Sequence, residues 1–391
     1  MPRSWLLATF AACVVGGVIA VPAAPPVQAA DDKDKAKEKN KAIEAAVEKG
    51  LEYLKKTQAQ DGHWEAQGGQ YPTSMTALAG MAFLMEGSTL KEGKYSDQVK
   101  KAVDWFLAPA RQQPNGMIGD ARNPTESVRY MYGQGFGTLF LACVYGEEED
   151  VAQRKRLEAV ITKAIDFIAR AQTRKTHRKP EGREVEIGGW GYVSATDNNS
   201  FDEGSVTITQ LQALRAARNA GIKVPKETID KALAYLEACT TNDGGIVYNY
   251  TGNSAGGQGR PPLTAAAICC GFSGGQYRGE LPKKWLKNCQ RHIWPTIARG
   301  RQAHDEYQTY YFAQAMYALG DNRWAELFPD EPAETRLTWT KYKEAMYPYV
   351  MEAQNRADGS WQSGFVGNVF STAVNLTLLQ LEKGILPIYQ R

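Results

Sequence analysis

The stretch KGLEYLKKTQAQDGHW, residues 49–64, contains the features that decide the fold. Apolar residues recur at helical spacing in its first half, and Gly62 can then take the left-handed conformation that ends a helix. Trp64 can fold back over the helix end, where the amide of Gln58 can bond carbonyl groups that the last turn leaves free. The stretch therefore predicts an amphipathic helix that is closed by a glutamine and a tryptophan.

The same arrangement recurs along the chain. Residues 344–361, EAMYPYVMEAQNRADGSW, repeat it almost completely. Weaker copies begin at Lys101, Lys163, Lys231 and Lys283. Six units account for the spacing of these copies.

Each unit continues into a second helix that is more apolar and rich in alanine and glycine. These second helices are expected at 73–86, 126–145, 205–220, 263–272, 306–319 and 371–383. A helix that is apolar on most faces is buried, whereas the first helices keep a charged face. Alternating outer and inner helices predict an all-α fold, an α/α toroid (α6/α6 barrel) around a central cavity. An open solenoid is the alternative, but it would need polar capping repeats, and the first and last units are the best formed.

The N-terminal segment is expected to lie outside this fold. Residues 1–30 combine a basic start, an apolar stretch and small residues at their end, which is typical of a secretory signal peptide. Export to the periplasm or the exterior is therefore predicted, with a retained membrane anchor or lipid attachment at Cys13 as alternatives. Residues 31–41, DDKDKAKEKNK, predict a charged tether, which leaves 42–391 as a single toroid domain.

Charge and cysteine content exclude several classes of protein. The 46 basic and 43 acidic residues nearly balance, so no nucleic-acid partner is expected. Without Cys13, five cysteines remain at irregular spacing, which is no disulfide framework. The basic segment 174–183, RKTHRKPEGR, is expected to be a solvated loop, and contact with anionic head groups or wall polymer is its functional alternative.

The motif residues also carry a resemblance to a known family. Lys49-Gly50, Tyr53-Leu54, Gln58, Gly62 and Trp64 resemble the QW motif of squalene and hopene cyclases. The whole mature chain looks like the terpenoid cyclase and protein prenyltransferase superfamily, and most like its exported bacterial prenyltransferase/squalene oxidase repeat proteins. This resemblance implies the toroid fold, but it does not assign an activity, because one fold hosts many chemistries.

The sequence lacks the chemistry that the resemblance would imply. The Asp-x-Asp-Asp acid of squalene-type cyclases is absent, and Asp202–Glu203 is the nearest equivalent. Protein prenyltransferases place a zinc-binding histidine in Asp-x-Tyr-His-Thr, and Gln308 stands at that position here. Thr264 and Ala266 stand where the aspartate and cysteine ligands would be. These side chains cannot hold zinc, so we expect no metal and no cofactor.

Polar and aromatic residues near the heads of the inner helices are the functional candidates. The candidate catalytic carboxylates are Glu126, Asp202, Glu203 and Asp305. The candidate ligand-binding residues are Arg129, Tyr130, Trp190, Tyr192, Tyr307, Gln308 and Tyr311. If the ring closes, these heads gather at one mouth, which the long loops 188–205 and 248–262 would cover. The alternative for each acid is helix capping, and for Arg129 an ion pair with a neighbouring acid.

Three functions remain open at this point. The first, which the sequence favours, is a toroid that binds an isoprenoid or other lipid in an aromatic cavity. The second is a carboxylate-dependent enzyme that processes envelope glycans. The third is a non-catalytic envelope scaffold. A cavity lined by Phe, Tyr and Leu would favour the lipid-binding toroid. A groove with sugar-stacking aromatics around Glu126 and Asp202 would favour the glycan-processing enzyme. A cavity filled by its own side chains would favour the scaffold.

Overall fold

The computed structural model describes residues 27–120, 122–252, 256–273, 279–300, 306–362 and 366–390. Residues 1–26 of the expected signal peptide and Asp305 lie outside these residues, whereas 27–30 lie in helix α1 (Val27–Thr57). The chain divides into two units, Met1–Ala42 and Ile43–Arg391, and the account below concerns the second. Residues 31–41, which were expected to form a tether, lie in helix α1.

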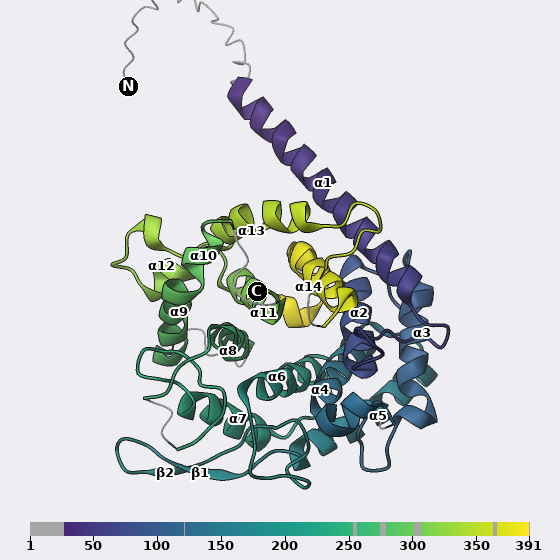
Figure 1. The fold of residues 1–391 in the computed structure, drawn as a ribbon, viewed down its shortest axis with the longest axis vertical. Helices are drawn as coiled ribbons and strands as arrows, with labels where there is room; N and C mark the ends of the chain where they lie inside the picture. The colour runs from purple at the N-terminus through teal and green to yellow at the C-terminus, as the bar shows by residue number, and fades with distance from the viewer. Residues whose placement is uncertain are drawn as a thin grey trace, which may run out of the picture. The chain divides into compact units, whose positions relative to one another are not determined.

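Six helical hairpins make up the described part of the second unit, arranged as an outer and an inner ring (Figure 1). The outer helices are the part of α1 (Val27–Thr57) from Ile43 onward, α3 (Ser96–Leu107), α5 (Val151–Arg170), α7 (Lys226–Ala238), α9 (Glu280–His292) and α13 (Trp339–Ala353). The inner helices are α2 (Pro72–Glu86), α4 (Pro124–Glu147), α6 (Gly204–Asn219), α8 (Pro261–Ser273), α11 (Glu306–Leu319) and α14 (Asn368–Gln380).

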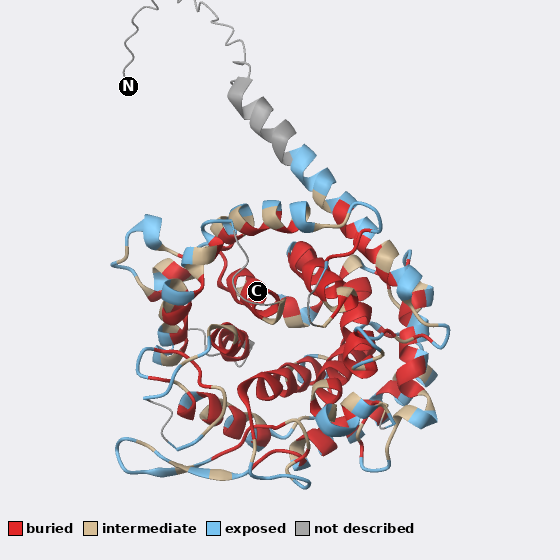
Figure 2. Cartoon of the chain, viewed as in Figure 1, coloured by how far each residue is buried: buried red, intermediate tan, exposed pale blue. Residues whose placement is uncertain are grey.

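The burial of the two rings follows their sequences. The inner helices are buried along most of their length, whereas the outer helices keep an exposed face (Figure 2). Short helices complete the outer layer and the chain end: α10 (Trp294–Ile297), α12 (Arg323–Leu327), η1 (Pro109–Arg111), η2 (Ala333–Thr335), η3 (Leu381–Lys383) and η4 (Pro387–Tyr389). The five cysteines at 143, 239, 269, 270 and 289 are free and buried.

The basic insertion forms a β-hairpin instead of an irregular loop. Strand β1 (Lys175–Arg178) pairs antiparallel with β2 (Glu184–Ile187), with Lys175 opposite Ile187. Val185 and Ile187 supply the alternating apolar side chains that such a hairpin needs.

The ring closes between the last hairpin and the first. Gln354 Nε2 donates to the carbonyl of Ala46 at 2.8 Å, and Gln380 Nε2 donates to that of Ala82 at 3.1 Å. Helix α14 packs on α2 as well as on α11, so the inner helices form an unbroken cycle. The predicted α/α toroid is therefore confirmed over the open solenoid.

The glutamine–tryptophan turns hold each hairpin to the next. Gln58 Nε2 donates to the carbonyl of Gly62 at 2.8 Å and to that of Gln98 in the next outer helix at 3.0 Å. Trp64 Nε1 donates to the carbonyl of Leu54 at 2.7 Å, which ties the indole under its own helix end. Because one amide bonds two hairpins, the local motif sets the spacing of the ring.

Candidate functional site

Heads of neighbouring inner helices meet in pairs at one end of the ring. Asn123 Nδ2, before α4, donates to the carbonyl of Gly69, before α2, at 2.8 Å. Tyr132 of α4 donates to Glu203 Oε1, at the head of α6, at 3.0 Å. Ser371 of α14 donates to Glu306 Oε1 of α11 at 3.2 Å. Residues that are far apart in sequence thus come together at this end of the ring, which we call the mouth.

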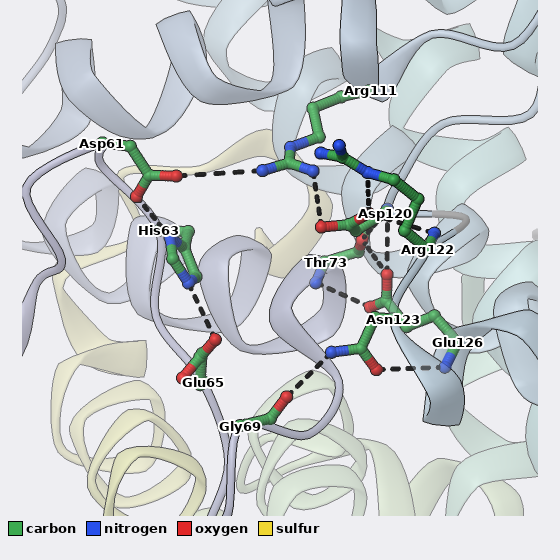
Figure 3. Close-up of polar contacts among 10 residues, drawn as sticks. All are labelled: Asp61, His63, Glu65, Gly69, Thr73, Arg111, Asp120, Arg122, Asn123 and Glu126. Atoms are coloured by element: carbon green, nitrogen blue, oxygen red, sulfur yellow. Dashed lines mark hydrogen bonds and ion pairs between the residues drawn. The ribbon is translucent and has the colours of Figure 1, made fainter.

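Glu126 caps a helix other than its own (Figure 3). Its Oε1 accepts the backbone N–H of Thr73 at 2.7 Å, and its Oε2 accepts the Thr73 hydroxyl at 2.6 Å and the backbone N–H of Asp120 at 3.0 Å. Tyr71, which precedes α2, offers that helix no side-chain cap, so Glu126 satisfies donors that α2 leaves free. Burial raises the pKa of Glu126, against the lowering effect of these hydrogen bonds.

Ion pairs surround this cap and join the first two turns (Figure 3). The Arg111 guanidinium lies 2.5 Å from Asp120 Oδ2 and 3.8 Å from Asp61 Oδ2, and it stacks 4.6 Å from the Trp105 ring. His63 contacts Asp61 through Nδ1 and Glu65 through Nε2. The ion pair of Arg111 with Asp61 joins two repeats, so the sequence did not predict it. The network fastens the turns and leaves the acids paired.

Replacing Glu126 by glutamine is expected to destabilise the protein by about 1–3 kcal/mol, the cost of a buried donor without an acceptor. Each carboxylate oxygen accepts a backbone N–H, so the glutamine NH₂ must face one of them in either orientation. Chemical denaturation measures the loss. Glu65→Gln is the matched control, because that carboxylate is about half exposed. If the Glu126→Gln protein had the same denaturation midpoint as the Glu65→Gln control, the cap would be shown to be dispensable.

The acids before α6 are also structural. Glu203 is 0% exposed and is the N-cap of α6, where it accepts the backbone N–H groups of Ser205 and Val206 at 2.9 Å. Burial raises its pKa. Asp202 pairs with Lys175 Nζ at 2.6 Å and accepts the Thr173 hydroxyl at 3.1 Å. Part of the basic insertion therefore neutralises a buried acid, and neither carboxylate faces open solvent as a catalytic group would.

An aromatic and cationic cluster lies beside Glu203. It consists of Arg129, Tyr192, Phe201, Tyr248 and Arg260, and we call it the mouth cluster. Arg129 lies 4.7 Å from the Tyr192 ring centroid, and Arg260 lies 4.7 Å from that of Tyr248. The hydroxyls of the two tyrosines contact each other, and Phe201 packs 5.2 Å from Tyr192. All three rings are half-buried and both arginine residues are exposed. Each guanidinium covers one face of its tyrosine ring, and its positive charge remains available to a ligand.

Local backbone geometry positions the cluster. Arg129 has φ −145° and ψ 36°, a kink near the head of α4 that departs from helical geometry. Beyond the kink, Met131 donates its backbone N–H to the carbonyl of Tyr192 at 3.1 Å. Tyr130 donates to Asp197 at 2.5 Å and accepts from the backbone N–H of Ser194 at 2.6 Å. Tyr130, predicted to bind ligand, thus anchors the loop that carries Tyr192.

Three residues predicted to contact a ligand are part of the core instead. Trp190 is fully buried, and its Nε1 donates to the carbonyl of Ile168 at 2.8 Å, as the tryptophan of the third repeat turn. Tyr311 is 0% exposed and packs 4.7 Å from Tyr307 and 4.9 Å from Tyr310. Gln308 is also buried. Another aromatic candidate, Tyr307, is half-buried.

The chain itself fills the opposite end of the ring. Tyr389, in η4, is buried, and its hydroxyl lies 2.8 Å from that of Tyr310. Beside it, Gln212 Nε2 donates to Gln314 Oε1 at 2.9 Å, and Arg215 lines the same small pocket. This end of the interior is therefore lined by amides and tyrosine hydroxyls as well as apolar groups.

Two further properties of the described residues bear on function. No three His, Cys, Asp or Glu side chains among them are placed to hold a metal ion. None of the described helices is both long enough and apolar enough to span a membrane.

Comparisons with known proteins support the fold. No family model matches the chain, and no curated protein matches it. Among solved structures, an alpha-1,6-mannanase from Salegentibacter sp. HEL1_6 is similar with a TM-score of 0.58 and 10% identity, over 88% of this chain and 99% of that one. An inactive variant of this enzyme in complex with alpha-1,6-mannotriose has a TM-score of 0.55 and 10% identity, over 86% and 98%.

A second kind of toroid is similar as well. The type II terpene cyclase MstE from Scytonema has a TM-score of 0.52 and 13% identity, over 89% of this chain and 99% of that one. At such low identities the likeness shows the fold alone. The chain is thus an α/α-toroid protein of the architecture shared by glycan-cleaving and terpene-cyclising enzymes. The narrower resemblance to prenyltransferase/squalene oxidase repeat proteins stays an expectation.

Proposed function

We propose that this chain is an exported toroid protein that binds a small glycan or lipid at the mouth, without zinc prenyltransferase or cyclase chemistry. Export rests on the signal-peptide pattern of residues 1–30. Of the two ligand classes, the mouth cluster supports a glycan more strongly, because its half-buried tyrosine rings offer flat faces to the C–H face of a sugar.

The charge of the mouth cluster supports an acidic glycan in particular. Among the described residues, no carboxylate lies within ion-pair distance of Arg129 or Arg260, although both guanidinium groups are stacked and held in place. A guanidinium bonds a carboxylate through two parallel N–H groups, and an aromatic neighbour preorganises it for that contact. The single observation that carries the proposal is this pair of stacked arginines without an acid partner.

Binding is better supported than hydrolysis. A glycosidase needs two carboxyl groups that reach the scissile bond, one with a raised pKa. Burial raises the pKa of both Glu126 and Glu203, yet their oxygens accept hydrogen bonds from helix heads and neither side chain is exposed. The proposed activity is therefore recognition of a glycan.

The test is a titration with an acidic oligosaccharide, such as an oligogalacturonide, followed by calorimetry. We expect Arg129→Ala and Arg260→Ala each to weaken binding about tenfold or more, since a hydrogen bond to a charged group contributes about 1.5–3 kcal/mol. Arg122→Ala is the matched control, because it removes the same charge from a side chain that is 80% exposed. If all three variants lost the same amount of binding affinity, the binding would be explained by general charge attraction, and a specific site would be contradicted.

The second candidate ligand, an isoprenoid or other lipid, would occupy the interior of the ring. Phe136 packs 6.4 Å from Tyr310, and the half-buried Tyr307 lies beside Tyr311, so aromatic side chains line part of the interior. Native mass spectrometry of protein extracted from its own envelope distinguishes the candidates. A retained isoprenoid that survives the Arg129→Ala substitution would favour the lipid and overturn the glycan proposal.

A further inference from the structure

A separate pocket lies at the mouth on the side away from the mouth cluster, between α11, α13 and α14. Its volume is about 440 Å³, within the range of about 300–1,000 Å³ that is usual for small-molecule sites. Its polar lining consists of Glu306, Tyr349, Asn355, Gln362, Ser371 and Asn375.

One hydrogen bond aligns this part of the ring with the other hairpins. In four repeats, the backbone N–H of the residue that closes the turn donates to a threonine of the inner helix at 3.0 Å. The pairs are Trp64 with Thr76, Trp190 with Thr207, Ile246 with Thr264, and Trp361 with Thr372. These threonines are therefore equivalent positions.

The residue before the threonine shows what is special in the last hairpin. It is Met75, Val206 or Leu263 in the other three repeats, and each of these side chains is buried. The equivalent residue in α14 is Ser371, whose hydroxyl donates to Glu306 Oε1 at 3.2 Å. The fold tolerates an apolar residue at this position, so the polar group here reflects a requirement of the pocket.

The position three residues after the threonine is alanine in α2 and α8 (Ala79 and Ala267), and an amide in α6 and α14 (Gln210 and Asn375). The Gln210 amide bonds the carbonyl of Met131 at 2.7 Å, whereas Asn375 lines the pocket. Asn375 is 6% exposed, and its Nδ2 donates to the carbonyl of Ser371 at 2.9 Å, which leaves Oδ1 as an acceptor. Because Asn375 lines the pocket, this acceptor is available to a ligand there.

The remaining groups define the chemistry of the ligand. No cation among the described residues lies within ion-pair distance of Glu306. Asn355 Oδ1 accepts the backbone N–H of Ala357 at 2.9 Å, so its Nδ2 is the group left to donate. Tyr349 is half-buried and supplies a flat wall. Donors, acceptors and one ring face in a small pocket suit a hydroxyl-rich ring, and the carboxylate disfavours an anion.

We propose that this pocket binds one monosaccharide unit that carries no negative charge, either neutral or bearing an amine. Ser371 and Glu306 would bond neighbouring hydroxyl or amine groups, and Asn355 and Asn375 would bond others. The pocket is separate from the mouth cluster and does not depend on the acidic-glycan proposal. If both hold, the mouth has two binding regions of opposite charge preference.

The test titrates the full mature chain with methyl α-mannoside, glucosamine and galacturonate, observed by ligand NMR. Ser371→Val and Asn375→Ala introduce residues that equivalent helices already carry, so the fold should persist. We expect each to weaken binding of the neutral or amino sugar about tenfold, while galacturonate binding and the melting temperature stay near wild type. Glu306→Gln should weaken glucosamine more than methyl α-mannoside.

The outcomes separate this inference from the proposed function. Arg129→Ala should affect galacturonate alone. Wild-type protein that binds neither methyl α-mannoside nor glucosamine would overturn the pocket, and so would Ser371→Val protein that binds them like wild type. Wild-type protein that binds methyl α-mannoside or glucosamine but not galacturonate would instead count against the mouth cluster.

Discussion

Replacing Gly62 by alanine is expected to destabilise the ring by about 2–5 kcal/mol. Gly62 has a φ of +102°, and for a residue with a Cβ the left-handed conformation costs about 1–2 kcal/mol. In addition, a Cβ would lie 2.3 Å from the carbonyl oxygen of Lys101 in the next outer helix. Relieving that overlap requires a backbone shift between two hairpins, which costs about a further 1–3 kcal/mol.

Gly182→Ala is the matched control for this variant. Gly182 also has a positive φ, +86°, but nothing lies within 4 Å of where its Cβ would be. Replacing Gly182 by alanine should therefore lower the free energy of unfolding only by the cost of the left-handed conformation, about 1–2 kcal/mol. Guanidinium denaturation of both variants separates the two contributions. If Gly62→Ala lost no more stability than Gly182→Ala, the close approach of the turn to Lys101 would not hold the hairpins together.

Replacing Trp361 by alanine is expected to cost about 3–5 kcal/mol and to weaken the closure of the ring. The indole is buried, its Nε1 donates to the carbonyl of Val350 at 2.7 Å, and a Cβ on Gly50 would lie 2.8 Å from its ring. Trp361 therefore fills the contact between the last outer helix and the first. The cavity left by the substitution lies at the seam of the ring.

Hydrogen exchange is the appropriate measurement, since it reports on each hairpin separately. Protection should fall most in α1, α13 and α14. Trp294→Ala is the control, because that indole is only half-buried and lies in α10, away from the seam. A uniform loss of protection, or one equal to that of the control, would contradict a role in closure.

The acids predicted as candidate catalytic groups make contacts that the sequence does not show. Glu126, Asp202 and Glu203 were expected at the mouth as candidate catalytic groups, and they do lie at helix heads. Their bonding partners come from distant segments: Glu126 reaches Thr73, and Asp202 reaches Lys175 in β1. In the sequence, a carboxylate at the start of a helix looks the same whether its side chain contacts a ligand or a neighbouring helix.

Trp190 could have been assigned to the core from sequence. It follows Gly188 and Gly189 as the tryptophan of the third repeat, displaced from Gln172 by the β-hairpin insertion. Its indole makes the same bond to its helix end as Trp64 does. Arg260, by contrast, carries no signal in the sequence beyond its place before the two prolines that begin α8.

The sequence by itself favoured a closed ring, and the contacts between the last hairpin and the first complete it. The sequence determined the repeat and the alternation of outer and inner helices. These features rest on interactions within about twenty residues: a helix end, a glycine turn, and a tryptophan folded back over the turn. The tertiary structure decided which head groups are caps and which remain open to a ligand. Tyr192 and Tyr248, or Glu306 and Ser371, meet only because neighbouring hairpins pack side by side, and that packing depends on ring closure rather than on local sequence.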